Sequence, residues 1–405
     1  MSLKRRILIV GHDVTLAHLG RPLTLANAAI DDGWDVHLAT SDRIDTIQHD
    51  FTGPLHRLTT VDPGRFARNL AQGRPVFSAR ELEAQLAEDI ELISATDPAL
   101  IVGDFRLTMG IASRLHGVGY ANLTNAYWSP WAQNRFTVPD LPVLRHLPSA
   151  LSQALFDLAR PVAFAIHARP LRQLFVRIGI KNPPDSLQTA YTFGDVQLFS
   201  DLPSVYAGAQ FPPSCRFIGP VQWAPKTVRP AWWNEALEHH PLAYVCMGSS
   251  GNQNVLAKVV EALAGMGVRS MVAGSPKALE HSPAKAWVEP FIDGAEAAAI
   301  CDIVVCNGGS PSTYQALAAG KPVVGICGNL DQYLNMHHIG RAGAGLTLRS
   351  DSLSRHRLRE AADLALNDPA IRRAAQKLQG EIETHEAGAA FTRFLRERFE
   401  DSTPS

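Results

Sequence analysis

Two residues in the first third of the chain have the types and positions that acid–base chemistry needs. His18 lies near the start of an expected helix, and Asp104 follows the apolar run Leu100-Ile-Val-Gly. A neutral histidine can remove a proton from a hydroxyl near pH 7, and a carboxylate can orient that histidine and stabilise its protonated form. Each residue also has a simpler interpretation, because helix starts and strand ends often carry capping residues. No Gly-x-Ser-x-Gly elbow accompanies the pair, which disfavours an α/β-hydrolase.

His12 and Asp13 form a second candidate pair. They directly follow the apolar run Ile7–Val10, which predicts a buried strand, so His12 is the alternative base. The adjacent histidines His239-His240 and His337-His338 have no partners at metal-ligand spacing and are interpreted as surface or packing residues. No Asp-x-Asp motif is present, and we expect no metal site.

The strongest local pattern follows Cys306. A strand is expected to end there, and Gly308-Gly309 allow a close approach of the backbone. Ser312 with Gln315 three residues later is a capping-box pattern that marks a helix start. A Gly-Gly turn at a helix N-terminus presents N–H groups and the positive end of the helix dipole, so it can hold a phosphate. An ordinary capped strand–turn–helix unit would give the same pattern.

The elements that must position these residues alternate between short apolar strands and amphipathic helices. This alternation is typical of a parallel sheet covered on both faces. In the first half we expect strands at Ile7–Val10, Val36–Thr40, Leu100–Gly103 and Tyr120–Leu123, with helices at Leu23–Ile30 and Met109–Leu115. In the second half we expect strands at Leu242–Met247, Arg269–Ala273, Ile303–Cys306 and Val323–Cys327, with helices at Val255–Gly265 and Thr313–Ala319. Ligands bind at the carboxyl ends of such strands, so two halves that face each other across a cleft would offer two ligand sites.

Residues 127–180 interrupt this alternation. Aromatic side chains gather at the start of this insertion, and two apolar helical stretches follow, Leu151–Ile166 and Leu171–Ile178. Aromatic side chains make flat, rigid contacts with ring-shaped substrates. We expect the insertion to line an apolar acceptor pocket, although packing of the insertion onto the sheet would explain the same residues. The candidate walls are Trp128, Trp131 and Phe136.

A stretch rich in proline and tryptophan, Phe211 to Trp233, separates the two halves. Such a composition resists both helix and sheet, which favours a linker. We expect a first Rossmann-like domain at residues 1–215, a linker at 216–240 and a second Rossmann-like domain at 241–385. Residues 386–405 are expected to form a C-terminal helix that packs back on the first domain.

Composition narrows the class of protein. The chain has 405 residues, of which 46% are hydrophobic and 19% charged, as in a globular protein of two or three domains. Its 38 basic and 39 acidic side chains leave no positive excess for nucleic acid. The five cysteines include no CxxC and are expected to be buried and reduced. No apolar window approaches the roughly 20 residues of a membrane span, and the first apolar run is too short for a signal peptide. We expect a cytoplasmic protein without stable membrane insertion.

The segment after Cys306 resembles the signature of the family 1 nucleotide-sugar glycosyltransferases of the GT-B fold. That signature runs His-Gly-Gly-x-x-Ser, Glu or Gln-Ala-Leu, Gly-x-Pro and Asp-Gln. This chain has four matching pieces in the same order, which are Gly308-Gly309-x-x-Ser312, Gln315-Ala316-Leu317, Gly320-Lys321-Pro322 and Asp331-Gln332. The resemblance implies an α/β protein with two Rossmann-like domains. It also implies that Gly309 and Ser312 touch the donor diphosphate. Asp331 and Gln332 would bind the sugar hydroxyls.

Two positions depart from this signature. Asn307 stands where the family has its diphosphate-binding histidine, and Pro311 stands where it has an asparagine. An asparagine amide can donate a hydrogen bond but carries no positive charge. Stabilisation of the leaving group would then depend on backbone N–H groups and the helix dipole. We expect Asn307 and Gly308 to be part of the donor site.

Two further segments resemble donor-binding segments of the family. Tyr244-Val-Cys-Met-Gly248-Ser249-Ser250 is similar to a strand and Gly-Ser turn whose serine, here Ser249, faces a phosphate. Trp287-Val-Glu-Pro290-Phe291 lies where the family places an aromatic side chain on the nucleobase. Trp287 and Phe291 are therefore candidates for that contact, and core packing is the alternative for each.

The first half also resembles the family. Ala17-His18-Leu-Gly-Arg21-Pro-Leu-Thr-Leu-Ala26 is similar to the pattern Gly-His-x-x-Pro-x-Leu-x-Leu-Ala. The alignment puts His18 on the family's general base and Asp104 on the aspartate that orients it. Ala17 replaces the glycine, and Arg21 replaces the proline. His12 lies where the family's loop approaches the acceptor, so it is a candidate acceptor contact as well as the alternative base.

The resulting hypothesis is an inverting glycosyltransferase of the hexosyltransferase type, in natural-product glycosylation. It would move a sugar from a nucleoside diphosphate, UDP or dTDP, to a hydroxyl of a small hydrophobic acceptor, and the resemblance implies no cofactor and no metal. A catalytically silent donor-binding protein is the alternative that Asn307 favours, and a GT-B-fold sugar-nucleotide epimerase is another. An NAD-dependent dehydrogenase is disfavoured, because no GxGxxG follows Ile7–Val10.

Overall fold

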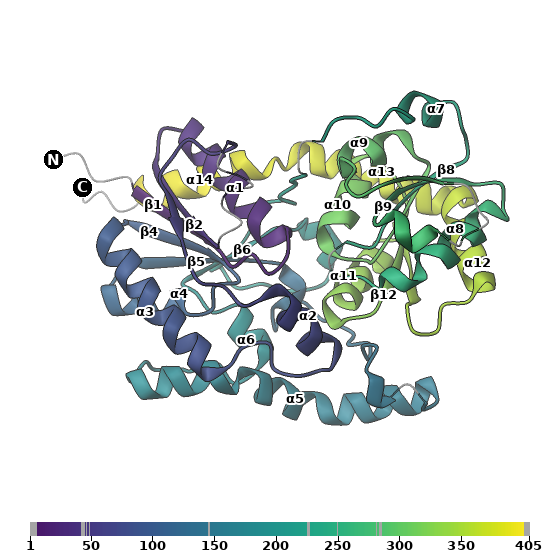
Figure 1. Cartoon of the computed structure of the whole chain (residues 1–405). Helices are drawn as coiled ribbons and strands as arrows, with labels where there is room; N and C mark the ends of the chain where they lie inside the picture. Colours follow the sequence, from purple (N-terminus) through teal and green to yellow (C-terminus); the bar gives the residue numbers. More distant parts are fainter. Residues whose placement is uncertain are drawn as a thin grey trace. The chain divides into compact units, whose positions relative to one another are not determined.

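The structure is a computed structural model of the whole chain. It describes residues 6–41, 45, 47, 49–144, 146–224, 227–248, 250–280, 282 and 286–400. The chain divides into two compact units, each built around one sheet (Figure 1). The first unit comprises Met1–Gln133, Gln153–Trp223 and His385–Ser405, and the second comprises Asn134–Ser152 and Ala224–Thr384. Part of the insertion, Asn134–Ser152, therefore belongs to the second unit, although its position in the chain lies within the range expected for the first domain.

Seven parallel strands form the sheet of the first unit, in the order β3-β2-β1-β4-β5-β6-β7. The order reverses between β1 and β4, which makes this pair the topological switch point of the sheet. Every residue of β4 is buried, as its continuous apolar run predicts for a central strand. The strands are β1 (Arg6–Gly11), β2 (Asp35–Thr40), β3 (Leu55–Arg57), β4 (Leu100–Asp104), β5 (Gly119–Thr124), β6 (Val196–Phe199) and β7 (Cys215–Phe217).

Helices cover both faces of this sheet. Ile7 and Ile9 of β1 belong to the core shared with α1 and α14, whereas Leu8 and Val10 belong to the core shared with α3, α4 and α5. The alternation follows from the two-residue period of a strand. The helices are α1 (Ala17–Asp31), α2 (Pro63–Ala71), α3 (Ala79–Thr96), α4 (Met109–His116), α5 (Ser149–Ile178, its first residues in Asn134–Ser152), α6 (Leu187–Tyr191) and α14 (Ala387–Glu400), with the short 3-10 helices η2 (Ala126–Trp128) and η4 (Pro203–Tyr206).

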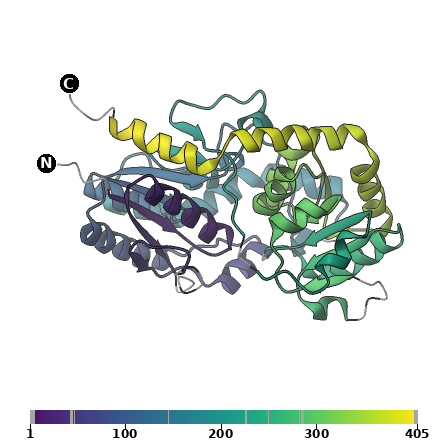
Figure 2. The ribbon, with the colours of Figure 1, turned by 90° about the horizontal axis from the view of Figure 1, so that it is seen from above.

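The C-terminal helix α14 belongs to the first unit. It runs beside α1, as the yellow and purple helices show in both views (Figures 1 and 2). Phe391 and Leu395 of α14 are fully buried in the core that also contains Leu23 and Ala26 of α1. The last helix of the chain is therefore part of the first unit's core and follows the whole of the second unit in sequence.

The second unit repeats the plan with six parallel strands in the order β10-β9-β8-β11-β12-β13. Its switch point lies between β8 and β11. The strands are β8 (Leu242–Cys246), β9 (Arg269–Ala273), β10 (Trp287–Glu289), β11 (Ile303–Cys306), β12 (Val323–Cys327) and β13 (Gly345–Arg349). The helices are α7 (Trp233–Leu237), α8 (Leu256–Ala264), α9 (Gly294–Ile300), α10 (Ser310–Ala318), α11 (Leu330–Arg341), α12 (Arg355–Asn367) and α13 (Pro369–Thr384), with the 3-10 helices η3 (Pro142–Leu144), η5 (Gln253–Val255) and η6 (Pro276–Leu279).

The prediction that Ser312 and Gln315 cap a helix is wrong. The helix α10 begins at Ser310 with Gly309 as its N-cap, because Pro311 fits the first turn of a helix, where its missing N–H costs nothing. Ser312 thus lies inside the first turn. Gln315 packs instead against Gly294, where an added Cβ would lie 2.3 Å from its Oε1.

Three other segments differ from the expected pattern. The helix α1 begins at Ala17, six residues before the expected Leu23, so His18 lies within its first turn. The expected linker 216–240 contains the end of β7, which pairs with β6, and the whole of the helix α7. The two expected apolar helices of the insertion form the single helix α5.

Two sequence-based expectations can be compared with the fold directly. All five cysteines are buried and unpaired. In the part of the chain that the structure describes, we find no helix with the length and apolar character of a membrane span.

Candidate active site

The carboxyl ends of β1 and β4 bring His18 and Asp104 together. Gly11, the last residue of β1, pairs in register with Asp104, the last residue of β4, and the next residue, His12, donates its N–H to the Asp104 carbonyl oxygen at 2.9 Å. A Cβ on Gly11 would lie 2.4 Å from the His18 carbonyl oxygen, so the start of α1 can approach β1 this closely only over a glycine. The candidate base therefore lies at the switch point of the sheet.

The His18 imidazole is held by the Asp104 carboxylate. Their Nδ1 and Oδ1 atoms are 2.7 Å apart, and the side chains are 19% and 1% exposed. Because a carboxylate can only accept, Nδ1 carries the proton of the neutral ring and Nε2 carries the lone pair. Within the described part of the chain, Nε2 makes no hydrogen bond. This geometry suits a general base, and the two predicted residues are in direct contact.

Arg21, one turn further along α1, binds the same carboxylate. Its Nε donates to Asp104 Oδ2 and its Nη2 donates to Asp104 Oδ1, both at 2.9 Å. Its Nη1 donates to Asn125 Oδ1 at 2.7 Å. Burial raises the pKa of Asp104, but the nearby charges of Arg21 and His18 outweigh burial and hold this pKa below its usual value. Sequence reasoning noted Arg21 only as a replacement for a proline and missed this contact.

His12 is fully buried at the end of β1. Its Nε2 accepts a hydrogen bond from the Val61 N–H at 3.1 Å, and its Nδ1 has no hydrogen-bond partner among the described residues. Burial, followed by the charges of Arg106 and His18, lowers the pKa of His12 well below its usual value. Because its lone pair is occupied and its ring is enclosed, the geometry favours His18 over His12 as the base.

An aromatic cluster adjoins the His18 ring on the side of Phe105. Phe105 stacks on it with centroids 4.8 Å apart and planes at 14°. Phe105 has φ of +60°, a strained conformation for a bulky residue that only its packed surroundings can hold. Sequence reasoning missed most of this cluster, because its members come from separate loops and helices; the position of Phe105 directly after Asp104 was the available signal. The cluster comprises Phe66, Phe77, Phe105, Trp128 and Tyr191.

The three expected acceptor walls lie in different surroundings. Trp128 belongs to the aromatic cluster through Tyr191, whose ring centroid is 4.9 Å away. Trp131 is half-buried in the same unit. Phe136 is also half-buried, but it lies in the segment Asn134–Ser152 of the second unit. Trp128 is therefore linked through Tyr191 to Phe105, the ring that stacks on His18, whereas Phe136 belongs to the other unit.

In the second unit, Asn307 directly follows β11 at the switch point. Its Oδ1 accepts the Gly309 N–H at 3.0 Å, and its Nδ2 donates to Ser250 Oγ at 3.3 Å. Gly308 has φ of +79°, and a Cβ there would lie 2.6 Å from Cys327 Sγ, so this turn admits only glycine. Asn307 thus shapes the turn that leads into α10, where Ser312 hydrogen-bonds the Cys246 side chain.

Asp331 and Gln332 lie in the first turn of α11. Gln332 is buried and completes a capping box with Asn329, because its Oε1 accepts the Gly328 and Asn329 N–H groups at 2.8 and 3.3 Å. Its Nε2 reaches Ser250 O and Oγ, both at 3.3 Å. Asp331 is half-buried.

Ser250 therefore joins the turns after β8 and β11 to α11, whereas sequence reasoning singled out its neighbour Ser249 as a phosphate contact. Asn307 and Gln332 both donate to Ser250 Oγ. Ser249, the predicted phosphate contact, lies outside the described residues. The Gly-Ser-Ser-Gly sequence that begins at Gly248 was the signal for this turn, although it did not distinguish the two serines.

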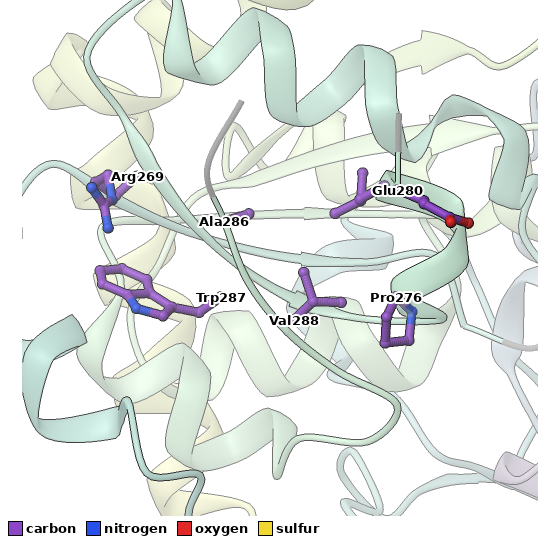
Figure 3. A pocket seen from close by; sticks show the side chains of 7 residues that line it. Arg269, Pro276, Glu280, Ala286, Trp287 and Val288 are labelled. Atoms are coloured by element: carbon purple, nitrogen blue, oxygen red, sulfur yellow. The ribbon is translucent and has the colours of Figure 1, made fainter. Parts of the chain in front are cut away.

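The two candidates for nucleobase stacking differ in exposure. Trp287 is 8% exposed, with Arg269 4.4 Å above its ring centroid and Trp232 stacked at 6.0 Å. Figure 3 shows the Arg269 and Trp287 side chains at one end of a cavity of about 400 Å³ between β9, η6 and β10. Phe291, two residues after β10, is 62% exposed. Phe291 is thus the candidate with a ring face available to a base.

A carboxylate that the sequence did not suggest anchors the insertion in the second unit. Asp140 accepts hydrogen bonds from Ser350 Oγ at 2.6 Å and from Arg349 Nη2 at 3.0 Å, and its N–H donates to the Gly328 carbonyl oxygen at 2.8 Å. Burial, followed by the charge of Asp351, raises the pKa of Asp140. Gly328 directly precedes the capping box of α11, so the insertion borders the loop that leads into the helix carrying Asp331.

Among the described residues, no group of three or more His, Cys, Asp or Glu side chains is arranged to hold a metal ion.

Comparisons with known proteins cover nearly the whole chain. Residues 254–390 match the family described as "Erythromycin biosynthesis protein CIII-like, C-terminal domain". A PGL/p-HBAD biosynthesis glycosyltransferase of Mycobacterium tuberculosis is 37% identical over 376 residues, which cover 93% of this chain and 88% of the relative. A PGL/p-HBAD biosynthesis rhamnosyltransferase of Mycobacterium bovis is 38% identical over 380 residues, or 93% of this chain and 84% of the relative.

A solved structure shares the fold. The spinosyn rhamnosyltransferase SpnG matches with a TM-score of 0.69 and 19% identity, over 97% of this chain and 100% of that chain. Two parallel-sheet Rossmann-like units of this kind define the GT-B class. The chain belongs to the family 1 nucleotide-sugar glycosyltransferases of the GT-B fold, and the protein is a glycosyltransferase.

Proposed function

We propose that this glycosyltransferase moves a sugar, with inversion, from a UDP- or dTDP-linked donor to a hydroxyl of a small hydrophobic acceptor. The observation that carries the proposal is the His18–Asp104 pair, whose Nε2 lone pair makes no hydrogen bond within the described residues. A glycosyl acceptor is a poor nucleophile until a base removes its proton, and a neutral imidazole suits that step.

The proposed reaction forms one carbon–oxygen bond, breaks another and transfers one proton. The acceptor O–H gives its proton to His18 Nε2 while its oxygen bonds to the anomeric carbon of the donor. The bond from that carbon to the diphosphate oxygen breaks on the opposite face, and the nucleoside diphosphate leaves with the electron pair. Asp104 holds the ring and stabilises the imidazolium that forms.

The donor would bind in the second unit. Backbone N–H groups at the start of α10 and the positive end of its dipole would face the diphosphate, with Asn307, Gly309 and Ser312 at that turn. Asp331 would accept hydrogen bonds from sugar hydroxyls, and Phe291 would stack on the base. The Mycobacterium bovis relative and SpnG are both named rhamnosyltransferases, and SpnG is also known in complex with thymidine diphosphate. These names support a dTDP-linked sugar as the first donor to test.

The acceptor would bind in the first unit, on the aromatic cluster beside His18. SpnG is known in complex with spinosyn aglycone, and the aromatic rings around Phe105 offer flat apolar contacts to a similar class of ligand. We place the reaction in the cytoplasm, which the five unpaired cysteines support.

A two-stage assay tests the proposal. Thermal shift of the purified full-length chain with UDP and dTDP identifies the nucleotide, because a ligand that binds the native state raises the melting temperature. Turnover of the matching sugar nucleotide with ring-containing hydrophobic alcohols should then release nucleoside diphosphate and give a product of inverted anomeric configuration. Binding of sugar nucleotides without turnover of any acceptor, or turnover restricted to free sugars, would contradict the proposal.

The acceptor side has its own matched test. Trp128→Ala removes a ring of the aromatic cluster, and Leu237→Ala removes an exposed side chain of α7 in the second unit. We expect the first change to raise KM for the acceptor or alter acceptor preference, with nucleoside diphosphate binding unchanged. The second should alter neither. Equal effects of both changes would contradict the placement of the acceptor.

A further inference from the structure

A charged side chain, the Arg21 guanidinium, contacts both members of the His18–Asp104 pair in the first unit. Arg21 is 7% exposed and Asp104 1% exposed, so the pair is shielded from solvent. The two side chains meet through two parallel hydrogen bonds of 2.9 Å, which is the forked geometry in which arginine binds a carboxylate most firmly. The same guanidinium lies 3.1 Å from His18 Nδ1.

We propose that Arg21 is a positioning residue that fixes both oxygens of Asp104 and opposes protonation of His18 before the acceptor binds. The inference rests on the proposed role of His18 as the general base. It adds a residue that acts through Asp104 and does not itself touch the substrate.

The electrostatic part of the argument starts from the carboxylate. A buried carboxylate 2.7 Å from an imidazole strongly favours the imidazolium, which has no lone pair and cannot act as a base. Arg21 offsets the charge of Asp104 and places a second positive charge beside Nδ1. The carboxylate can then still orient the ring through Nδ1, while Arg21 opposes its attraction for a second proton.

The geometric part concerns how Arg21 is itself held. Its Nη1 donates to Asn125 Oδ1 at 2.7 Å, and Asn125 Nδ2 donates to Asp201 Oδ1 at 3.1 Å. Asp201 Oδ2 also accepts the Ala126 N–H at 2.7 Å. The loop after β5 thus fixes the guanidinium, and the guanidinium fixes Asp104 at the end of β4. A lysine could supply the charge at this position, but it could not bind Asp104 and Asn125 in the same fork.

The other groups that face this site do not replace Arg21. From β4, the side chains are Asp104 and the uncharged Phe105 ring. From the end of β1, the nearest is His12, which burial keeps neutral. Asp201 and Tyr127 act on Arg21 and lie beyond it. Arg106 is paired with Asp89 through Nε and Oδ1 at 2.9 Å.

The experiment measures the titration of His18 and the pH profile of turnover separately. Full-length chain with isotope-labelled histidine is titrated by NMR, and the His18 signal is assigned by its loss in His18→Gln. In Arg21→Met, we expect the His18 midpoint to move to higher pH by about one unit, and the acid limb of kcat/KM to move with it. An unchanged midpoint in Arg21→Met overturns the inference.

Arg21→Lys separates the effect of the positive charge from the effect of the forked hydrogen bonds. It also provides a second test in case Arg21→Met does not fold. It should leave the midpoint within a few tenths of a unit, because the charge remains, while kcat at the pH plateau falls by roughly tenfold, because the fork is lost. Full plateau activity in Arg21→Lys would overturn the positioning role.

Arg106→Met is the matched control, since it removes a second buried, carboxylate-paired arginine from the same unit. It should leave the His18 midpoint unchanged, and an equal shift would assign the effect to general loosening. The NMR midpoint needs no turnover. If the His18 midpoint shifts in Arg21→Met but the separate variant His18→Gln retains activity, the proposed base is rejected. The electrostatic role of Arg21 is then still supported.

Discussion

The two units use one sheet topology to build two different sites. In each unit the strand order reverses at a central pair, β1 and β4 in the first and β8 and β11 in the second. The first switch point holds an imidazole, a carboxylate and a guanidinium in contact, from His18, Asp104 and Arg21. The second holds neutral amides, a hydroxyl and glycines, with Asn307 and Gln332 both bonded to Ser250.

This difference separates what the fold supplies from what the side chains add. A reversed strand order leaves a crevice at the carboxyl ends of the strands in both units. Charged groups in that crevice can move a proton, whereas backbone N–H groups at the start of a helix can hold an anion without moving one. The comparison predicts that substitutions at the first switch point change chemistry, and that substitutions at the second change donor recognition.

The largest expected effect is that of His18→Ala. Loss of a positioned general base lowers turnover by about 10²–10⁴-fold, while binding of nucleoside diphosphate should not change because that site is in the other unit. Turnover under saturating donor and thermal shift with nucleotide measure the two separately. His12→Ala is the companion variant. If it abolished turnover while His18→Ala remained near wild type, His12 would be the base and the comparison would need a different residue.

Asp104→Asn should lower turnover in the same direction as His18→Ala but by less, since it removes the partner of the imidazolium and keeps the base. The double variant should lose little more than His18→Ala alone, because both residues serve one proton transfer. Multiplication of the two single effects in the double variant would show that Asp104 does not act through His18.

The same substitution predicts a change in the pH dependence of stability. The pKa of Asp104 lies below its usual value in the folded chain, so its charge stabilises the fold above the unfolded-state pKa of about 3.9. This stabilisation is lost as the pH falls through the folded-state pKa. Asp104→Asn should therefore be less stable than wild type at neutral pH, with a difference that shrinks toward acid pH. Chemical denaturation at several pH values measures it, and a constant difference would contradict the assignment.

At the second switch point, Asp331→Ala should lower turnover by roughly ten- to a hundredfold, the worth of one hydrogen bond to a charged group of about 1.5–3 kcal/mol. Binding of free nucleoside diphosphate should remain, since Asp331 is expected to touch the sugar. Calorimetric titration with the nucleotide checks this. Collapse of nucleotide binding would place Asp331 at the phosphate and would remove the proposed division between the sugar and phosphate contacts.

Several central strands were predictable from sequence. Arg269–Ala273, Ile303–Cys306 and Val323–Cys327 form strands with the expected bounds, because central parallel strands are continuous apolar runs. The inner strand β6 was not predicted, and neither were the four edge strands β3, β7, β10 and β13, of which the first three have only three residues each. Short edge strands depend on pairing with a neighbour, which local sequence does not record.

The candidate site divides in a similar way. The pairing of His18 with Asp104 was predicted from the resemblance to the family, and both residues lie near the ends of expected elements. Arg21 and Phe105 each adjoin a predicted residue, yet their contacts depend on side-chain packing. Gln332 shows the opposite case, since a motif position expected to bind sugar is buried as a helix cap. Spacing along the chain predicts which ends of strands and helices lie together. It does not predict which side chains, such as Gln332, are used as structural caps and are therefore not available to a ligand.

The smallest expected effect is that of Asn307→His. This variant tests whether the second switch point requires an uncharged side chain at this position. Asn307 accepts the Gly309 N–H and donates to Ser250 Oγ. A neutral histidine ring can accept at one nitrogen and donate at the other, whereas the protonated ring loses the acceptor but adds a positive charge. We expect the variant to fold and to bind nucleoside diphosphate as well as wild type or slightly better, as measured by calorimetry. Asn307→Asp is the matched control, because it keeps the shape and the Gly309 contact but places a negative charge beside the expected phosphate. It should weaken nucleotide binding, and the loss should lessen at high ionic strength, because salt screens such repulsion. Equal binding by the aspartate and histidine variants would show that no phosphate lies at this turn, and the contrast between the two units would then rest on the first site alone.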